Sequence, residues 1–428
     1  MPRLRLLPTT SVLVMLCAMY FITYLDRVNV STAAPGFAAE FHLNNTEVGL
    51  IFSAFAYPYL VFQIIGGWIS DKYGARRTLI VCGLLWAAAT LLTGFATGLI
   101  SLLAARLLLG FGEGATFPAA TTAIARWVPK HKRGFAQGLT HSAARIGNAV
   151  APALVVAIMA VADWRAAFFV CGAISLIWVA LWAWVFTEHP HDHPRISEAE
   201  LAALPAAKGP APAVPWRALL KRMAPVTLVY FCYAWTLWLF LSWMPQYFMR
   251  SFALDMQHSA LLASLVFFAG FLGDNAGGLL TDWLLERGQS LPRARSMLVA
   301  ACMLLSLLCL LPVLFSHNLY LSLASLAGGF FFAEMVIGPM WAIPMDIAPE
   351  FSGTACGIMS TGSAAAAIVS PVVSGFLIDH FGSWDLPFVV SIGLLASGAL
   401  LALRMRPQDK FHCVSPALAM PSATANHP

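Results

Sequence analysis

The chain has 428 residues, of which 59% are hydrophobic and 11% are charged, and its mean hydropathy is +0.75. Soluble globular proteins carry about 25% charged residues, so this composition excludes a soluble globular fold and places most of the chain in lipid. The formal net charge is +5, but the basic residues form short clusters between apolar runs instead of one basic face, which argues against nucleic acid as a partner.

Apolar runs along the chain predict membrane-spanning helices, because a helix needs roughly 20 apolar residues to cross about 30 Å of hydrocarbon. In chain order they predict helices at 11–33, 47–69, 78–96, 101–124, 134–161, 165–187, 224–248, 259–281, 297–315, 319–342, 355–378 and 385–404. The expected fold class is therefore an all-α polytopic membrane protein with twelve transmembrane helices.

One longer polar stretch, residues 188–222, has six predicted spans on each side. It contains Pro205, Pro210, Pro212 and Pro215 among its charges, which is typical of a mobile linker. The predicted divisions are a first six-helix half at 1–187, the linker at 188–222, a second six-helix half at 223–405 and a tail at 406–428.

Basic residues set the expected orientation, because Lys and Arg near the ends of spans favour the cytoplasm. Of 25 Lys and Arg residues, 20 fall on the side that holds both tails and the linker, and only Arg165 and Arg250 fall on the other side. The remaining three, Arg27, Arg106 and Arg145, lie within predicted spans. We expect a multi-pass protein of the bacterial inner membrane with both termini cytoplasmic.

An internal repeat relates the two halves through three motif pairs about 211 to 221 residues apart. The pairs are GGWISD at 66–71 with GGLLTD at 277–282, Glu113-x4-Pro118 with Glu334-x4-Pro339, and Ala151-Pro152 with Ser370-Pro371. An even number of spans separates the members of each pair, so the repeats run parallel about an axis normal to the membrane. Two such halves with a site at their interface form the plan of a transporter.

The stretch GWISDKYGARR at 67–77 resembles the signature of the major facilitator superfamily between its second and third spans. More narrowly, the chain up to about residue 405 resembles the anion:cation symporters, which include carriers of hexuronate, galactonate, glucarate, tartrate and phthalate and the vesicular glutamate carriers. The matching residues are Tyr24-Leu-Asp26-Arg27, Ser53-Ala-Phe-Ala-Tyr57-Pro-Tyr59, Arg106-x3-Gly110-x2-Glu113-Gly114-x3-Pro118, Arg145-x-Gly-x4-Pro152 and Trp238-x4-Trp243-x-Pro245.

Charges inside the first half are the leading site candidates, because a charge at the bilayer centre costs on the order of 3 kcal/mol and needs a partner or a wet cavity. Arg106 and Glu113 are seven residues apart and share one helix face. The resemblance implies that Asp26 and Glu113 carry protons and that Arg27 meets the substrate carboxylate. The alternatives are a local ion pair for Asp26 and Arg27, and charge balance of Glu113 for Arg106.

Arg145 falls close to the middle of the fifth predicted span, with Asn148 one turn later. A second anchoring charge suits a sugar acid or a diacid, and hexuronate-type carriers, which the chain resembles, share an Arg here. Structural pairing, for instance with Glu113, is the alternative. Asp274 in the second half binds a cation or substrate hydroxyls, or pairs with another helix, and the sequence does not decide between these roles for Asp274 or assign one to Glu334.

The second half otherwise offers aromatic and amide groups that suit the ring or backbone of a polyol, although a lone Trp is more often packing. The candidate substrate-binding residues are Arg27, Arg145, Tyr24, Tyr59, Arg106, Asn148, Trp238, Gln246 and Trp341. In the resembling superfamily, the positions of Asp71, Arg76 and Arg77 serve gating. No H-E-x-x-H or G-x-S-x-G motif occurs, so we expect no enzyme, no catalytic residue, no metal site and no cofactor.

These features predict proton-coupled uptake of a small organic anion, most simply a sugar acid, by a carrier that works as a monomer. An inside-negative potential opposes anion entry by about 2.3 kcal/mol per charge per 100 mV, so accumulation needs protons carried with the substrate. An aromatic or dicarboxylic acid as substrate, and proton-coupled export, are the alternatives. The sequence leaves the substrate and the proton stoichiometry open.

Overall fold

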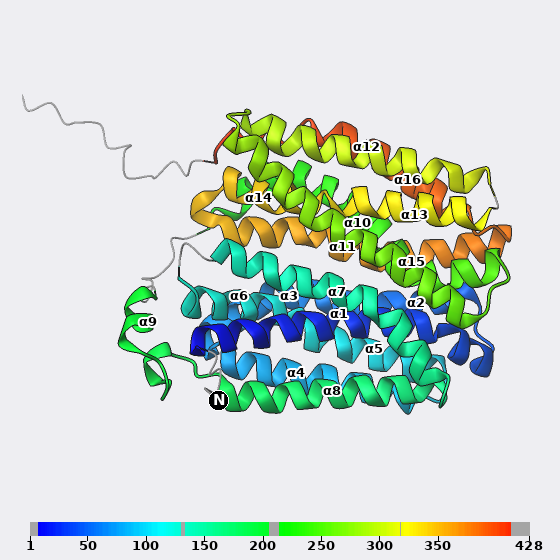
Figure 1. The fold of residues 1–428 in the computed structure, drawn as a ribbon, viewed down its shortest axis with the longest axis horizontal. Coiled ribbons are helices and arrows are strands. Elements are labelled where there is room, and N and C mark those ends of the chain that lie inside the picture. Colours follow the sequence, from blue (N-terminus) through cyan, green and yellow to red (C-terminus); the bar gives the residue numbers. More distant parts are fainter. Residues whose placement is uncertain (1–6, 130–132, 205–213, 317, 412–428) are drawn as a thin grey trace, which may run out of the picture.

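The computed structural model describes residues 7–129, 133–204, 214–316 and 318–411, and regular structure within them is helical. Figure 1 shows long helices lying side by side along the long dimension of the molecule. Ten helical segments of the described residues are long and apolar enough to cross a membrane. The chain is therefore an all-helical, multi-pass membrane protein.

The first group of helices is coloured blue to blue-green in Figure 1. It comprises α1 (Pro8–Phe41), α2 (Asn45–Ala54), α3 (Ala56–Tyr73), α4 (Ala75–Gly94), α5 (Leu99–Gly114), α6 (Thr116–Trp127), α7 (Arg133–Met159) and α8 (Trp164–Val185). These helices pack mainly on one another, most extensively α1 on α7 and α4 on α8. Six predicted spans fall on this group, with α2 and α3 sharing the second and α5 and α6 sharing the fourth.

The second group, green to red, packs beside the first. It comprises α10 (Trp216–Ser251), α11 (Met256–Glu286), α12 (Leu298–Leu310), α13 (Leu319–Glu334), α14 (Ile337–Ile347), α15 (Ser352–Phe381) and α16 (Leu386–Ala402). The predicted linker contains the short helix α9 (Glu198–Ala203), and its residues 205–213, with three of the four quoted prolines, lie outside the described residues. We call the end of the bundle that carries Pro8 and α9 the linker end, and the opposite end the far end.

Three spans that the hydropathy predicts as continuous helices are interrupted, at Phe55, at Ala115 and at Met335–Val336. Each interruption lies shortly before a proline. Pro58, Pro118 and Pro339 have no N–H, so the carbonyl four residues earlier loses its helical hydrogen bond and the helix breaks there. The second and third breaks follow Glu113 and Glu334 closely, so both repeated acids lie in the last turn of a helix segment.

The two groups come into close backbone contact where α2 packs on α15. A Cβ atom added to Gly49 would lie 2.5 Å from the carbonyl oxygen of Pro371, and one added to Gly375 would lie 2.3 Å from the carbonyl oxygen of Asn45. Only glycine allows backbones to approach so closely. A second contact between the groups runs along α7 and α11.

At the far end, Asp379 of α15 caps the first turn of α2 from the other group of helices. Its Oδ1 accepts hydrogen bonds from the Asn45 N–H (3.2 Å) and Nδ2–H (2.7 Å), and its Oδ2 accepts from the Thr46 N–H and Oγ1–H, both at 2.6 Å. A carboxylate at a helix N-terminus satisfies free amide donors and the positive end of the helix dipole. The two groups are therefore fastened together at the far end.

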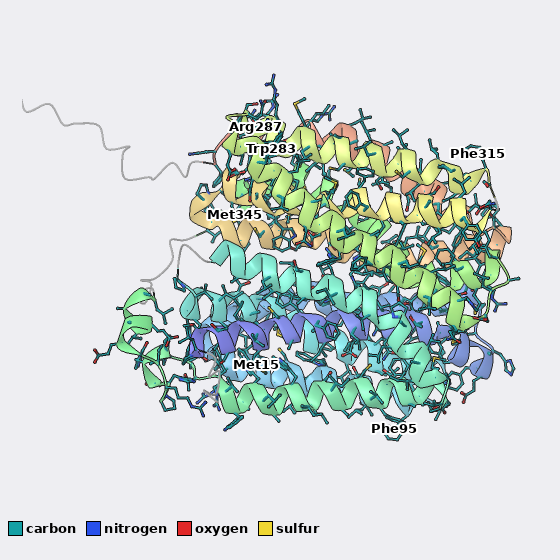
Figure 2. All side chains as sticks on the ribbon, viewed as in Figure 1. Met15, Phe95, Trp283, Arg287, Phe315 and Met345 are labelled. Atoms are coloured by element: carbon teal, nitrogen blue, oxygen red, sulfur yellow. The ribbon has the colours of Figure 1, made fainter. Side chains whose placement is uncertain are left out.

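We expect Asp379→Ala to loosen this fastening, because charge-assisted hydrogen bonds of partly exposed groups contribute about 1–2 kcal/mol. Spin labels at Phe95 and Phe315, which lie exposed at the far end (Figure 2), report the separation of the two groups by electron paramagnetic resonance. The variant should show a larger share of long distances. Asp255→Asn, which removes an exposed charge beside α11, is the matched control, and equal distance distributions in all three proteins would contradict the role of Asp379.

Candidate substrate and proton site

Arg27 of α1 and Glu113 of α5 form an ion pair in the interior of the bundle. The Nε and Nη2 atoms of Arg27 each lie 2.8 Å from Glu113 Oε2, and the side chains are 3% and 0% exposed. Glu113 Oε1 has no hydrogen-bond partner within the described part of the chain. One carboxylate oxygen thus accepts the hydrogen bond of Arg27 Nε and lies close to Nη2, and the other is left for a proton or a donor.

Aromatic rings surround the Arg27 guanidinium on its remaining sides. The distances from its Cζ to the ring centres are 4.7 Å for Tyr24, 5.0 Å for Tyr59, 5.3 Å for Phe117, 5.6 Å for Phe55 and 5.9 Å for Trp238. Ring faces attract a cation, and here they also exclude water from it. Trp238 belongs to α10, so Arg27 lies where the two groups of helices meet. Tyr24, Tyr59 and Trp238 were predicted, whereas Phe55 and Phe117 carried no sequence signal that separates them from packing residues.

Asp26 does not join this pair, although it precedes Arg27 in the chain. Its Oδ2 accepts a 3.4 Å hydrogen bond from Ser175 of α8, and its side chain is buried within the first group. Successive residues of a helix point about 100° apart, so neighbours in sequence address different partners. The alternative of a local Asp26–Arg27 ion pair is therefore not what the structure forms.

Arg106 lies within electrostatic reach of both Asp26 and Glu113. Its Cζ is 5.0 Å from the centre of the Phe55 ring, and its Nε has no hydrogen-bond partner among the described residues. Arg27 and Arg106 share the wall of a cavity of about 10 Å³, room for about one water. The other lining residues are Val30, Ser31, Phe52, Phe55, Trp238, Leu241 and Ser242.

A second charged cluster joins the two groups of helices, and we call Arg145, Asp274 and Glu334 the charged triad. Arg145 Nε lies 3.4 Å from Asp274 Oδ2 of α11, and Arg145 Nη2 lies 2.8 Å from Glu334 Oε2 of α13. Tyr233 donates a 2.7 Å hydrogen bond to Glu334 Oε1. Arg145 thus pairs with acids of the second group, and the alternative of pairing with Glu113 is not realised.

The remaining predicted substrate residues are two buried amides and one tryptophan. Asn148 is 1% exposed and Gln246 is 7% exposed. Both amide atoms of Asn148 and Nε2 of Gln246 lack a hydrogen-bond partner within the described ranges. Trp341 packs on His141, with 5.3 Å between ring centres, and so lies nearer the charged triad than the Arg27 pair. Buried amides without partners are donors and acceptors that a polar ligand could satisfy.

The predicted gating residues lie at the linker end. Arg76 donates from Nε to the carbonyl of Phe186 and from its backbone N–H to Glu188, each at 2.8 Å, so it ties α4 to the end of α8. Arg77 is exposed. The side chain of Asp71 lies outside the described residues, so gating by these three stays a prediction. Among the residues described, no three His, Cys, Asp or Glu side chains are grouped as metal ligands.

The profile of the Major Facilitator Superfamily matches residues 16–361 and 291–417 of the chain. The chain belongs to the Major Facilitator Superfamily. Among solved structures, a bacterial homolog of the human lysosomal transporter Spinster has the same fold, with a TM-score of 0.76 over 95% of this chain and 99% of that one, at 17% sequence identity. The resemblance to the superfamily that the sequence predicts is confirmed.

This Major Facilitator Superfamily member is similar to several transporters of organic anions. It is 44% identical to a probable sulfoacetate transporter of Cupriavidus necator over 92% of this chain and 93% of that protein. It is 30% identical to a D-galactonate transporter of Escherichia coli over 91% and 94% of the two chains. It is 28% identical to a hexuronate transporter of Bacillus subtilis over 94% of each. These names agree with the predicted anion:cation symporter family.

We expect Arg27→Met to destabilise the protein at alkaline pH by about 3–5 kcal/mol, because it leaves the Glu113 carboxylate buried without its partner. The double variant Arg27→Met/Glu113→Leu should recover most of that loss, since no charge remains. Thermal unfolding in detergent measures both. Arg165→Met, which breaks a partly exposed pair with Glu40, is the control and should cost less than about 1 kcal/mol. A double variant no more stable than Arg27→Met would contradict the pairing.

Proposed function

We propose that this chain imports a small organic anion by proton symport and alternating access, with the linker end facing the cytoplasm. The observation that carries the proposal is the buried Arg27–Glu113 pair at the meeting of the two groups of helices. The listed similarities to anion transporters and the membership of the Major Facilitator Superfamily support it.

The geometry of the pair suggests how proton and anion are coupled. While Glu113 is ionised, it occupies the donor edge of Arg27 that a substrate carboxylate or sulfonate would need. A proton on Glu113 removes this competitor and leaves Arg27 as a buried cation that an anion can neutralise. Proton and anion then bind with positive coupling, because each makes the site more favourable for the other. Asp26, which lies near Arg106, is the second proposed proton carrier of this site.

Alternating access fits the arrangement of the two helix groups and their contacts. We propose two six-helix halves, 1–187 and 223–405, in a twelve-span bundle joined by the linker at 188–222. The Asp379 cap holds the far end together, while the site near Arg27 has room for about one water. A substrate therefore enters or leaves only after the halves move apart on one side, which a rocking motion would provide.

Sugar acids are our first substrate class, and a compact dianion such as a carboxylate–sulfonate is the second. Tyr24, Tyr59 and Trp238 offer ring faces and hydroxyls that suit a polyol chain. The second class is favoured by the two arginines in one small cavity, because Arg27 and Arg106 together suit a ligand with two charged ends. The 44% identity to a probable sulfoacetate transporter supports this second class.

The test of the function is internal pH in proteoliposomes that hold the purified chain. Sugar acids, sulfoacetate, dicarboxylates and aromatic acids are added outside one at a time. Internal acidification with one substrate class, abolished by a protonophore, is the expected result. Internal alkalinisation would contradict symport and indicate antiport, and uptake unaffected by pH would contradict proton coupling. Empty liposomes control for the passive entry of protonated acids.

We expect Arg27→Ala to abolish uptake, because the anion loses its buried donor. Glu113→Gln and Asp26→Asn should each weaken the pH dependence of uptake while exchange of internal for external substrate continues. Radiolabelled uptake at several external pH values, with and without internal substrate, measures both effects. Arg165→Gln at the far end is the control and should keep wild-type uptake. Wild-type pH dependence in both acid variants would rule out the proposed proton carriers.

A further inference from the structure

The charged triad contains more negative than positive charge in a buried place. Arg145 and Glu334 are 4% and 0% exposed, and Asp274 is 11% exposed. One guanidinium faces two carboxylates, so the triad would carry a formal charge of −1 if both acids were ionised. The Arg27 site differs, because Arg27 and Arg106 balance Asp26 and Glu113.

Among the residues that the structure describes, the side chains packed around the triad supply no second cation. Tyr24 of α1 has its ring centre 5.8 Å from Arg145 Cζ, and Tyr230 stacks on Tyr233 of α10 at 5.5 Å. His141, one turn before Arg145, packs between the rings of Tyr20 and Trp341. The excess charge therefore has to be removed by something the triad binds.

Hydrogen bonding in the triad is also incomplete. Arg145 Nη1 has no hydrogen-bond partner among the residues that the structure describes, although the residue is almost fully buried. Glu334 Oε2 is approached by Arg145 Nη2 at 2.8 Å but has no hydrogen bond of good geometry in the same residues. A buried carboxylate oxygen without a hydrogen bond is costly, and a proton on the pair of acids lowers this cost.

We propose that the charged triad binds a second coupled proton, shared by Asp274 and Glu334, in addition to the proton carried beside Arg27. Asp274 is the most exposed member and receives the proton. Glu334 is fixed by Tyr233, and Arg145 links both acids to the first half. Protonation weakens the ion pairs that cross between the halves, so the same proton frees the halves to move. This inference rests on the proposed symport, in which Glu113 and Asp26 share one proton, and it assigns two protons per substrate.

The number of protons carried per substrate is measured in proteoliposomes, as the pH difference at which a given substrate gradient produces no net transport. With the membrane potential held at zero, a tenfold substrate gradient is balanced by a pH difference of about half a unit for two protons and about one unit for one proton, since each pH unit is a tenfold proton gradient. We expect about half a unit for the wild-type chain. Asp274→Asn and Glu334→Gln should each move the balance to about one unit. Wild-type balance in both variants would overturn the proposal.

Two controls complete this transport test. Glu286→Gln removes an exposed acid from the same helix as Asp274 and should leave the balance unchanged. A sodium gradient is then imposed without a pH difference. No shift of the balance is expected, and a shift would overturn the proposal by showing that the acids hold sodium. Asp274→Asn leaves the Tyr233–Glu334 hydrogen bond in place, so it serves if Glu334→Gln does not fold.

A second measurement separates this proposal from the proposed function. Infrared difference spectra of the purified full chain in detergent, without substrate, report protonated carboxyl groups through their C=O stretch. In the wild-type chain we expect a C=O band that disappears when the pH is raised. This band should be weaker in Asp274→Asn and Glu334→Gln, and it should have wild-type intensity in Glu286→Gln. If wild-type transport ignored pH but this band behaved as expected, the symport would fail and the proton site would stand. Identical bands in all four proteins would overturn the site.

Discussion

Compensation of buried charge is the constraint on which this structure depends. A charged side chain in a bundle surrounded by lipid needs a partner within the protein or a wet cavity. Glu113 neutralises Arg27 within the first group of helices, whereas Arg145 finds its acids in the second group. The first pair therefore stabilises one half, and the charged triad stabilises the contact between the halves. A movement that separates the halves leaves the first pair intact and breaks the second.

The two repeated acids, Glu113 and Glu334, lie at equivalent positions shortly before a proline, but their charged and hydrogen-bonding neighbours differ. Pro118 and Pro339 break their spans just after Glu113 and Glu334, so each acid lies in the last turn of a segment, near carbonyls with free acceptor capacity. Glu113 has two arginines of its own group near it, whereas Glu334 has a tyrosine hydroxyl and one arginine from across the interface. One repeated motif thus serves two electrostatic tasks.

The sequence predicted the helical spans and the buried charges, because both follow from composition along the chain. It could not predict partners. Asp26 and Arg27 are adjacent, yet one faces Ser175 and the other Glu113, since the partner depends on helix rotation. Asp274 had no assigned role because its partner is 129 residues away, on another helix. Asp379 gave no signal at all, because a helix cap supplied from a distant segment leaves no local pattern. The sequence predicted the three broken spans as continuous helices, because Pro58, Pro118 and Pro339 look the same in sequence as tolerated prolines such as Pro152 and Pro371.

The two polar contacts between the halves differ in burial, and this difference decides which of them costs more to break. The Asp379 cap lies at the far end, where its partly exposed hydrogen bonds contribute about 1–2 kcal/mol. The charged triad is more buried, and breaking a buried ion pair costs about 3–5 kcal/mol. The far end can therefore loosen readily, but the halves separate at the depth of the site only when the triad has been neutralised. Under the proposed second proton, an ionised triad resists this separation and a protonated triad permits it.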